Sequence, residues 1–220
     1  MKKIVFGGLL VLCFPAILFA QDKVDIPVWN VGDKWVFNRS SPNIKNQGAI
    51  EVVSADQDTY IVKFIDNICI VETQGFEAII IEKSTLHRSY ALTGNTREKY
   101  KKGRRTIFNF PFYAGKEWKD SYSAVSLVTS IETTPLDYYE IYKVLGWEEV
   151  EVEAGKFKAI KMEATVGHEA KGLAPAFEGK NLYWYSPDVK HFVKCQYDPM
   201  ILMYFPQIFN WELTSFKVKK

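Results

Sequence analysis

Apolar and polar residues alternate with a period of two along most of the chain that follows Gln21. The apolar positions are rich in β-branched and aromatic residues, which is typical of strands that bury one face in a core. Short polar breaks with turn-forming residues, such as 56–58 and 93–95, separate these segments. The strands predicted in the first half are 34–39, 49–54, 60–65, 67–73, 77–83 and 86–92.

A second group of alternating segments follows Gly115. In its clearest hairpin, valine and glutamate alternate over 149–153, and Gly155 permits a positive φ at the turn. This alternation predicts that the three glutamates form the solvent-facing side of a strand rather than a cation site. The predicted strands of this half are 117–131, 138–153, 157–166, 182–185, 192–197 and 208–218.

The breaks between successive segments are too short for the crossovers that parallel strands need. The stretch 167–181 is the longest irregular piece and is expected to be a loop or to hold one short helix. The predicted fold class is therefore all-β: a curved antiparallel sheet, or a partly open barrel or sandwich, with at most one or two short helices.

Two tetrapeptides share a pattern, GDKW at 32–35 and GKEW at 115–118. Each is a glycine turn that leads into a predicted strand with an early tryptophan. The pattern is compatible with two similar halves of the chain. It is equally compatible with two unrelated turns that have the same packing requirement.

Residues 1–20 have the three parts of a secretory signal peptide: the basic residues Lys2 and Lys3, an apolar run over 4–19, and the small residue Ala20. The apolar run is short for a membrane-spanning helix, and Pro15 interrupts its last turns. We therefore expect cleavage near Ala20, export to the periplasm or the outer cell surface, and no transmembrane span in the mature chain. Residues 21–220 are expected to form a single β-rich domain.

Removal of Lys2 and Lys3 leaves 26 basic and 26 acidic residues, so the mature chain has no net charge. A neutral exported chain is not expected to bind nucleic acid, although a basic run with interspersed aromatic residues spans 99–108. Two cysteines remain, Cys69 and Cys195. They are expected either to form a disulfide or to pack separately as small apolar side chains.

No motif in the sequence assigns a reaction. The histidines that remain after cleavage, His87, His168 and His191, are far apart and lack metal-ligand spacing. The chain contains no GxSxG, GxGxxG or GxxxxGK[ST] pattern. The sequence therefore favours a non-enzymatic protein, with no catalytic residue, metal or cofactor assigned.

Two proline-containing segments, 108–113 and 200–206, are too apolar for ordinary surface loops. They are expected either to cap the ends of the core or to line the mouth of a cavity for an apolar ligand. The candidate ligand-binding residues are Phe108, Phe110, Phe112, Tyr113, Met200, Leu202, Met203, Tyr204 and Phe205.

The order of several segments resembles that of an uncharacterised group of exported bacterial proteins, the TapB-like family. The matching segments are VGDKWVF at 31–37, FP at 110–111, AGKEW at 114–118, VEVEAGKFKAIK at 150–161, LYWYSPDV at 182–189, VK at 193–194 and WELTSFK at 211–217. One departure is Lys190, which with His191 stands where such proteins often have glycine, so the shape of this turn is in doubt. The resemblance implies a curved antiparallel sheet, similar to the unclosed barrel of LolA- and LolB-type lipoprotein carriers, and it brings no catalytic residues.

These observations give three hypotheses of different classes. The first is a non-enzymatic envelope protein that binds an apolar, lipid-like ligand in a concave sheet. The second is a structural or assembly protein that pairs with an envelope partner through strand edges. The third, which has least support, is a hydrolase that acts on envelope polymers.

Overall fold

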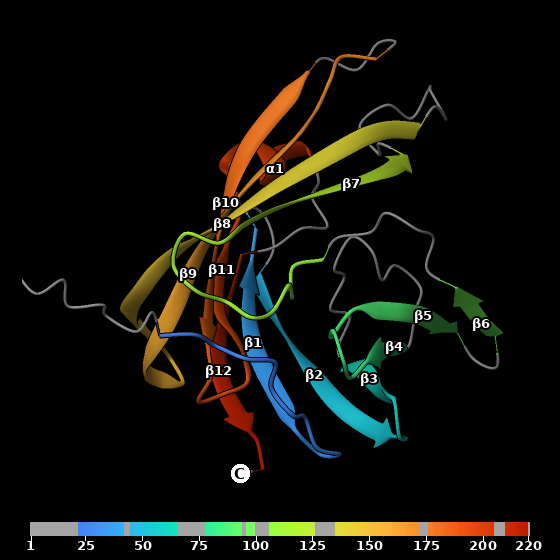
Figure 1. Ribbon diagram of the computed structural model, residues 1–220, viewed down its shortest axis with the longest axis vertical. Helices are drawn as coiled ribbons and strands as arrows, with labels where there is room; N and C mark the ends of the chain where they lie inside the picture. Colours follow the sequence, from blue (N-terminus) through green and yellow to red (C-terminus); the bar gives the residue numbers. More distant parts are fainter. Residues whose placement is uncertain are drawn as a thin grey trace, which may run out of the picture.

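The computed structural model describes residues 22–41, 45–65, 78–93, 96–99, 106–125, 135–171, 176–204 and 210–219. Within these ranges, twelve strands form one antiparallel sheet, accompanied by one short helix (Figure 1). The all-β fold class, the open antiparallel sheet and the near absence of helix are confirmed. None of the helices in the described part of the chain is long and apolar enough to cross a membrane.

The strands of the first half form a meander in chain order. They are β1 Lys34–Ser40, β2 Lys45–Ala55, β3 Thr59–Ile65, β4 Ala78–Glu82, β5 Arg88–Thr93 and β6 Thr96–Lys99. The second half forms another: β7 Glu117–Val125, β8 Pro135–Val152, β9 Gly155–His168, β10 Phe177–Ser186, β11 His191–Gln196 and β12 Asn210–Lys217, with helix α1 Pro199–Tyr204 before β12.

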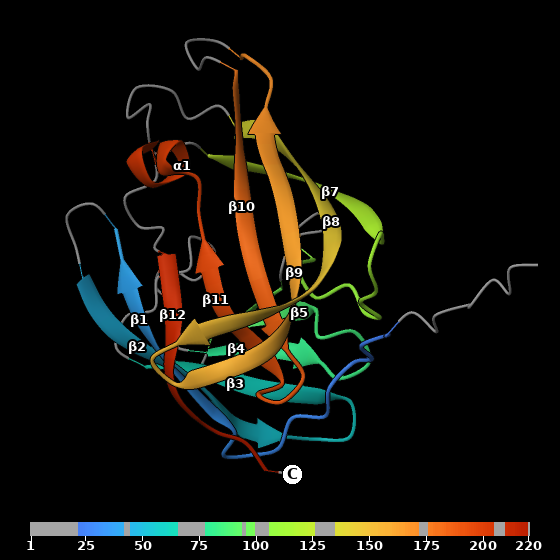
Figure 2. The ribbon, with the colours of Figure 1, turned by 90° about the vertical axis from the view of Figure 1, so that its left-hand side faces the viewer.

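The two meanders join where β1 pairs with β12, which places β6 and β7 at opposite edges of the sheet. The sheet is strongly bent, so β3 to β5 lie across the interior from β8 and β9 (Figures 1 and 2). The chain between β6 and β7 must therefore pass from one edge of the sheet to the other. This connection determines what fills the interior.

The two glycine turns noted in the sequence have the same structure. Gly32 N–H donates to the carbonyl of Val52 on β2 over 2.8 Å, and Gly115 N–H donates to that of Val144 on β8 over 2.9 Å. In each turn the valine N–H donates in the opposite direction, to the carbonyl of the residue after the glycine, Asp33 or Lys116. The φ angles of +91° and +84° explain why glycine occupies both positions. The turns thus occupy equivalent places at the start of each six-stranded half.

Two clusters of buried apolar side chains form the core. The first combines side chains of β1 to β4 with others from β8 to β12 and includes Trp29, Trp35, Phe37, Val52, Val62, Ile79 and Leu213. The second lies mainly on β8 to β11 and includes Val24, Phe112, Tyr142, Met162, Tyr185, Phe192, Cys195 and Ile201. The long hairpin of β8 and β9 also folds over β12, where Ala154 N–H donates to the carbonyl of Leu213 over 3.1 Å (Figure 2).

The stretch 167–181 differs from the prediction of an irregular loop. β9 continues to His168 and β10 begins at Phe177, so Gly167 and Gly179 both lie in strands. A Cβ on Gly179 would lie 3.1 Å from the Cβ of Asp198, which explains this glycine by close approach instead of by a turn. β6 was not predicted, and the predicted strand 67–73 lies outside the described residues.

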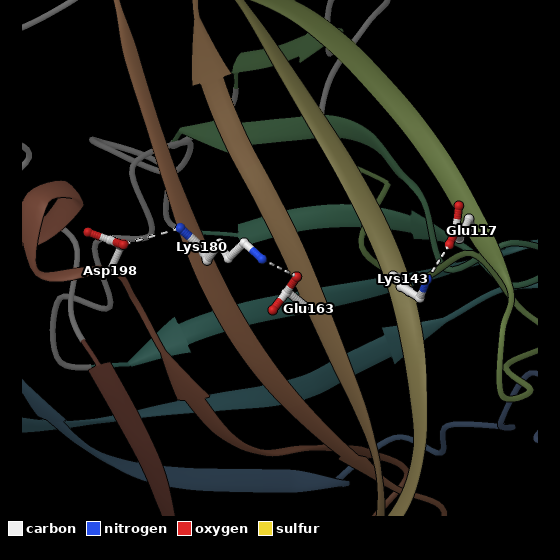
Figure 3. A network of polar contacts seen from close by, with 5 residues as sticks. All are labelled: Glu117, Lys143, Glu163, Lys180 and Asp198. Carbon is white, nitrogen blue, oxygen red and sulfur yellow. Dashed lines mark hydrogen bonds and ion pairs between the residues drawn. The ribbon is translucent and has the colours of Figure 1, made fainter.

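The outer face of β7 to β10 carries a row of alternating charges (Figure 3). Lys143 Nζ lies 2.8 Å from Glu117 Oε1, and Lys180 Nζ lies 2.9 Å from Glu163 Oε1. Lys143 and Glu163 face each other across β8 and β9, and Lys180 N–H donates to Asp198 Oδ2 over 3.2 Å. The hydrogen bond from Lys143 to Glu117 raises the pKa of Lys143. Such exposed pairs stabilise little, but they make this face polar. The exposed glutamates of 149–153 likewise confirm the predicted solvent side of β8.

The turn between β10 and β11 is closed by a lysine in the left-handed region. Lys190 has a φ of +58°, at the position where the sequence left the turn shape in doubt. Its Nζ donates to the carbonyl of Val28 over 2.9 Å and to that of Lys219 over 2.7 Å. Lys190 therefore links the two ends of the domain at the cost of a strained backbone.

Two substitutions separate the stabilising hydrogen bonds of the Lys190 side chain from the destabilising strain of its backbone. We expect Lys190→Ala to lower the free energy of unfolding by about 1–2 kcal/mol, because it loses both hydrogen bonds and keeps the strain. Lys190→Gly loses the same bonds but relieves the strain, so we expect it to be about 1 kcal/mol more stable than Lys190→Ala. Urea unfolding of the two variants measures the difference. Equal stability of the two would contradict the strain.

Candidate functional site

Residues 106–113, here called the crossing segment, lie between the edge strands β6 and β7 in the chain and pack against the interior of the sheet. At the end of the segment, Phe112 forms an isolated bridge with Val24, and their two backbone hydrogen bonds are each 2.8 Å long. Near its middle, the carbonyl of Phe108 lies 3.2 Å from His87 Nε2. The segment is thus bound to elements on both sides of the interior.

Lys116, just before β7, holds the middle of the crossing segment. Its Nζ donates to the backbone carbonyl of Asn109, to the side-chain oxygen of Asn109 over 3.1 Å, and to the carbonyl of Pro111 over 3.1 Å. Burial lowers the pKa of this ammonium group. One partly buried lysine therefore satisfies several backbone acceptors that the irregular segment leaves without a ladder partner.

Side chains of β7 fix the beginning of the crossing segment. Trp118 Nε1 donates to the carbonyl of Thr106 over 3.1 Å. The Oδ2 of Asp120 accepts the backbone N–H of Thr106 over 2.5 Å and also its hydroxyl. The segment is consequently held at defined points, and its three phenylalanine rings are placed by them.

The three phenylalanines differ in how deeply they are buried. Phe112 is inaccessible, and its ring centroid lies 4.2 Å from that of Phe110 and 5.5 Å from that of Tyr185. Phe108 and Phe110 are half-buried and pack against both core clusters. Tyr113 is exposed. The sequence analysis left two alternatives open for this segment, a cap on the core or the mouth of a ligand cavity. The depth of these rings is the observation that bears on that choice.

The second candidate segment, 200–206, was expected to be a loop, and this expectation was wrong for its first part. Met200 to Tyr204 belong to helix α1. Asp198 Oδ1 accepts the N–H of Met200 over 2.8 Å, and Pro199 stands at the first helical position. This Asp-Pro pair is a helix-start signal that the sequence analysis overlooked.

The candidate residues of this helix are placed as follows. Met200 is exposed, whereas its neighbour Ile201 is buried in the second cluster with Phe112. Leu202, Met203 and Tyr204 lie on α1, and Phe205 lies outside the described residues. A ligand-binding role for the nine candidate residues stays a prediction.

The sequence analysis found no metal-ligand spacing for His191, and the structure places this residue among aromatic rings. Its ring centroid lies between 5.0 and 6.2 Å from the centroids of Trp29, Trp35, Phe37, Phe108 and Trp211. Desolvation by complete burial lowers the pKa of this imidazole to about 4, and the nearby charge of Arg88 acts in the same direction. His191 is therefore neutral at neutral pH and sits where the crossing segment meets the interior.

A carboxylate pair faces the interior from β7 and β8, and the sequence analysis missed it. Glu140 is inaccessible and lies opposite Asp120 in the strand register. The Tyr122 hydroxyl donates to Glu140 Oε1 over 3.0 Å, and the Tyr142 hydroxyl donates to Oε2. The sequence did contain a signal for this buried carboxylate, because Glu140 alternates in phase with Tyr138 and Tyr142. Carboxyl groups can act as general acid and general base, so this facing pair is the feature that supports the hydrolase alternative.

No cluster of three or more potential metal ligands occurs among the residues that the structure describes. Cys195 is buried on β11 in the second cluster. Cys69 lies outside the described residues, so the predicted alternatives of a disulfide or two separate thiols remain open.

No family model and no curated protein matches the chain. Three solved structures are similar to it. The hypothetical lipoprotein YmcC from Escherichia coli (K12) has a TM-score of 0.46 and 10% identity, over 88% of this chain and 91% of that one. A candidate lipoprotein from Parabacteroides distasonis has a TM-score of 0.46 and 11% identity, over 90% of this chain and 100% of that one. A candidate exported protein with a YmcC-like fold from Bacteroides fragilis has a TM-score of 0.42 and 11% identity, over 88% and 99%. The TapB-like relation and the LolA type of fold stay predictions.

Proposed function

We propose that the mature chain is an exported, non-enzymatic envelope protein that binds an apolar, lipid-like ligand inside the bent sheet. The observation that carries the proposal is the state of Phe108 and Phe110. Both rings pack against the two core clusters, yet both stay half-buried on a segment whose pairing is a single bridge at Phe112. A ligand would bind by replacing these two rings, while the deeply buried Phe112 stays in place.

The energies of this exchange favour a long apolar chain. Burial of a whole phenylalanine contributes about 1.5–3 kcal/mol, so displacement of two half-buried rings costs about 1.5–3 kcal/mol in all. An acyl chain gains about 0.8 kcal/mol for each methylene group that it buries. Ten methylene groups would contribute about 8 kcal/mol, which exceeds the cost of the rings and leaves a margin for strained hydrogen bonds.

The export part of the proposal depends on residues 1–20, which lie outside the described residues. It is supported by the basic residues, the apolar run and Ala20, as derived from the sequence. The proposed place of action is the periplasm or the outer cell surface.

The binding proposal predicts saturable uptake of a fluorescent long-chain fatty acid analogue by delipidated protein of residues 21–220. Phe108→Ala is expected to raise its affinity about threefold to tenfold, because less aromatic surface has to be displaced. Ile141→Ala is the matched control, since Ile141 lies exposed on β8, and it should change affinity by less than about twofold. Absence of binding by both wild type and Phe108→Ala would refute the proposal.

The edges of the sheet support the second candidate function. In the described chain, β6 pairs only with β5 and β7 only with β8, so each could accept the strand of a partner. An assembly protein of this kind requires no opening of the interior. It therefore predicts that Phe108→Ala has no effect on partner binding.

A further inference from the structure

Ser186 and His191 form a polar pair at the ends of β10 and β11. They face each other in the strand register across the turn 187–190, so their side chains lie on the same side of the sheet. The turn is also fixed by Trp35, whose Nε1 donates to the carbonyl of Val189 over 2.6 Å. Ser186 is completely inaccessible, and no group in the described chain makes a hydrogen bond with its Oγ. A buried hydroxyl without a partner is uncommon in folded proteins, which makes this pair a candidate for ligand contact.

The hydrogen bonding of His191 defines what its second ring nitrogen can do. Nδ1 lies 3.2 Å from the carbonyl of Phe192. A carbonyl oxygen can only accept, so Nδ1 carries the proton in this bond. Because burial keeps the imidazole neutral, its Nε2 then presents a lone pair. The pair thus offers one acceptor, Nε2 of His191, and one hydroxyl that can donate, Oγ of Ser186.

The crossing segment covers the His191 member of this pair. The ring of Phe108 meets the ring of His191 edge to face, with 5.7 Å between the centroids. The displacement of Phe108 that the proposed function requires would therefore uncover His191 directly. The polar end of a ligand that entered along this path would arrive beside Nε2 and the hydroxyl of Ser186.

We infer, as an extension of the proposed function, that the ligand is a long-chain molecule whose polar end is an uncharged hydroxyl group, bound between His191 Nε2 and Ser186 Oγ. A hydroxyl both donates and accepts, so it satisfies both atoms at once. A carboxylate has no proton to donate and would meet the lone pair of Nε2, and it would also lose its hydration in an aromatic interior. Arg88, whose charge reaches His191, would favour a carboxylate instead and defines the competing ligand.

Three probes of equal chain length test the inference on protein of residues 21–220 at pH 8: dodecan-1-ol, its methyl ether, and dodecanoate. Competition with the fluorescent fatty acid analogue gives the three affinities. We expect dodecan-1-ol to bind about tenfold more tightly than the ether, which cannot donate to Nε2, and more tightly than dodecanoate. In Ser186→Ala, dodecan-1-ol should bind about threefold more weakly than to the wild type, because its oxygen loses the hydrogen bond from Oγ. Ser215→Ala, a matched control at an exposed serine on β12, should leave the affinity for dodecan-1-ol unchanged.

The outcomes separate the two levels of the hypothesis. If dodecanoate binds most tightly, or if Ser186→Ala binds dodecan-1-ol as tightly as the wild type does, the hydroxyl inference is overturned while apolar-ligand binding stands. Equal binding of all three probes would also overturn the hydroxyl inference and leave apolar-ligand binding standing. If none of the probes binds to the wild type, the proposed function fails and the inference fails with it.

Discussion

Replacing Phe112 with alanine is expected to lower the free energy of unfolding by about 3–5 kcal/mol, the range typical of a fully buried phenylalanine. The ring is inaccessible and packs between Phe110 and Tyr185, so the substitution leaves a cavity that the hydrogen-bonded backbone cannot easily close. The bridge to Val24 involves only backbone atoms and remains possible in the variant. Urea unfolding followed by tryptophan fluorescence measures the loss.

Phe108→Ala serves as the comparison for Phe112→Ala, because it removes the same atoms from the same segment. Phe108 is half-buried, so we expect a loss of about 1–2 kcal/mol. If the two variants lose equal stability, the crossing segment is not packed as the structure shows. The expected difference would identify Phe112 as the fixed ring of the segment and Phe108 as the ring that can be displaced at low cost.

A segment whose backbone is held at both ends and whose half-buried rings can be displaced suits the proposed binding. The bonds from Lys116 and Asp120 hold the backbone beside β7, so Phe108 and Phe110 can leave the interior without detaching the whole connection. Ligand binding then requires local rearrangement and not opening of the sheet. This is the physical reason why one ring, Phe108, was chosen for the binding test.

The sequence predicted most strands because each buries one face and exposes the other, as β1 and β9 do. The prediction failed where glycine has a packing role. Gly172, Pro175 and Gly179 suggested a loop over 167–181, but a Cβ at Gly167 or Gly179 would approach neighbouring atoms within about 3 Å, so these two glycines permit strand contact there. Sequence patterns do not distinguish a glycine required by a close neighbour from a glycine required by a turn.

The sequence also indicated the crossing segment, because 108–113 is too apolar for an exposed loop. It could not indicate what the segment covers. Phe108 and His191 are 83 positions apart, and their contact depends on the bend of the whole sheet. Ser186 gave no signal, because a serine at the end of a strand looks like an ordinary turn residue until its burial is known.

His191 is expected to make the stability of the protein depend on pH between about 4 and 6.5. The unfolded chain binds a proton at His191 with a pKa near 6.5, whereas complete desolvation, assisted by the charge of Arg88, lowers the pKa in the folded state to about 4. Between these values the unfolded state binds more protons, so the contribution of His191 is fully present above pH 6.5 and is lost as the pH falls to 4. The shift corresponds to about 3 kcal/mol, since one pKa unit is worth about 1.4 kcal/mol.

Carboxylates titrate at the lower end of the same range, so the measurement must isolate His191. His191→Leu removes the ionisable group and keeps an apolar side chain among the surrounding aromatic rings. We expect the stability of the wild type relative to His191→Leu to fall by about 3 kcal/mol between pH 7 and pH 4, as measured by urea unfolding at each pH. A parallel pH dependence of the two proteins would show that His191 can be protonated inside the folded domain. In that case the neutral ring, and with it the lone pair that the hydroxyl ligand requires, would be limited to pH values above about 6.5.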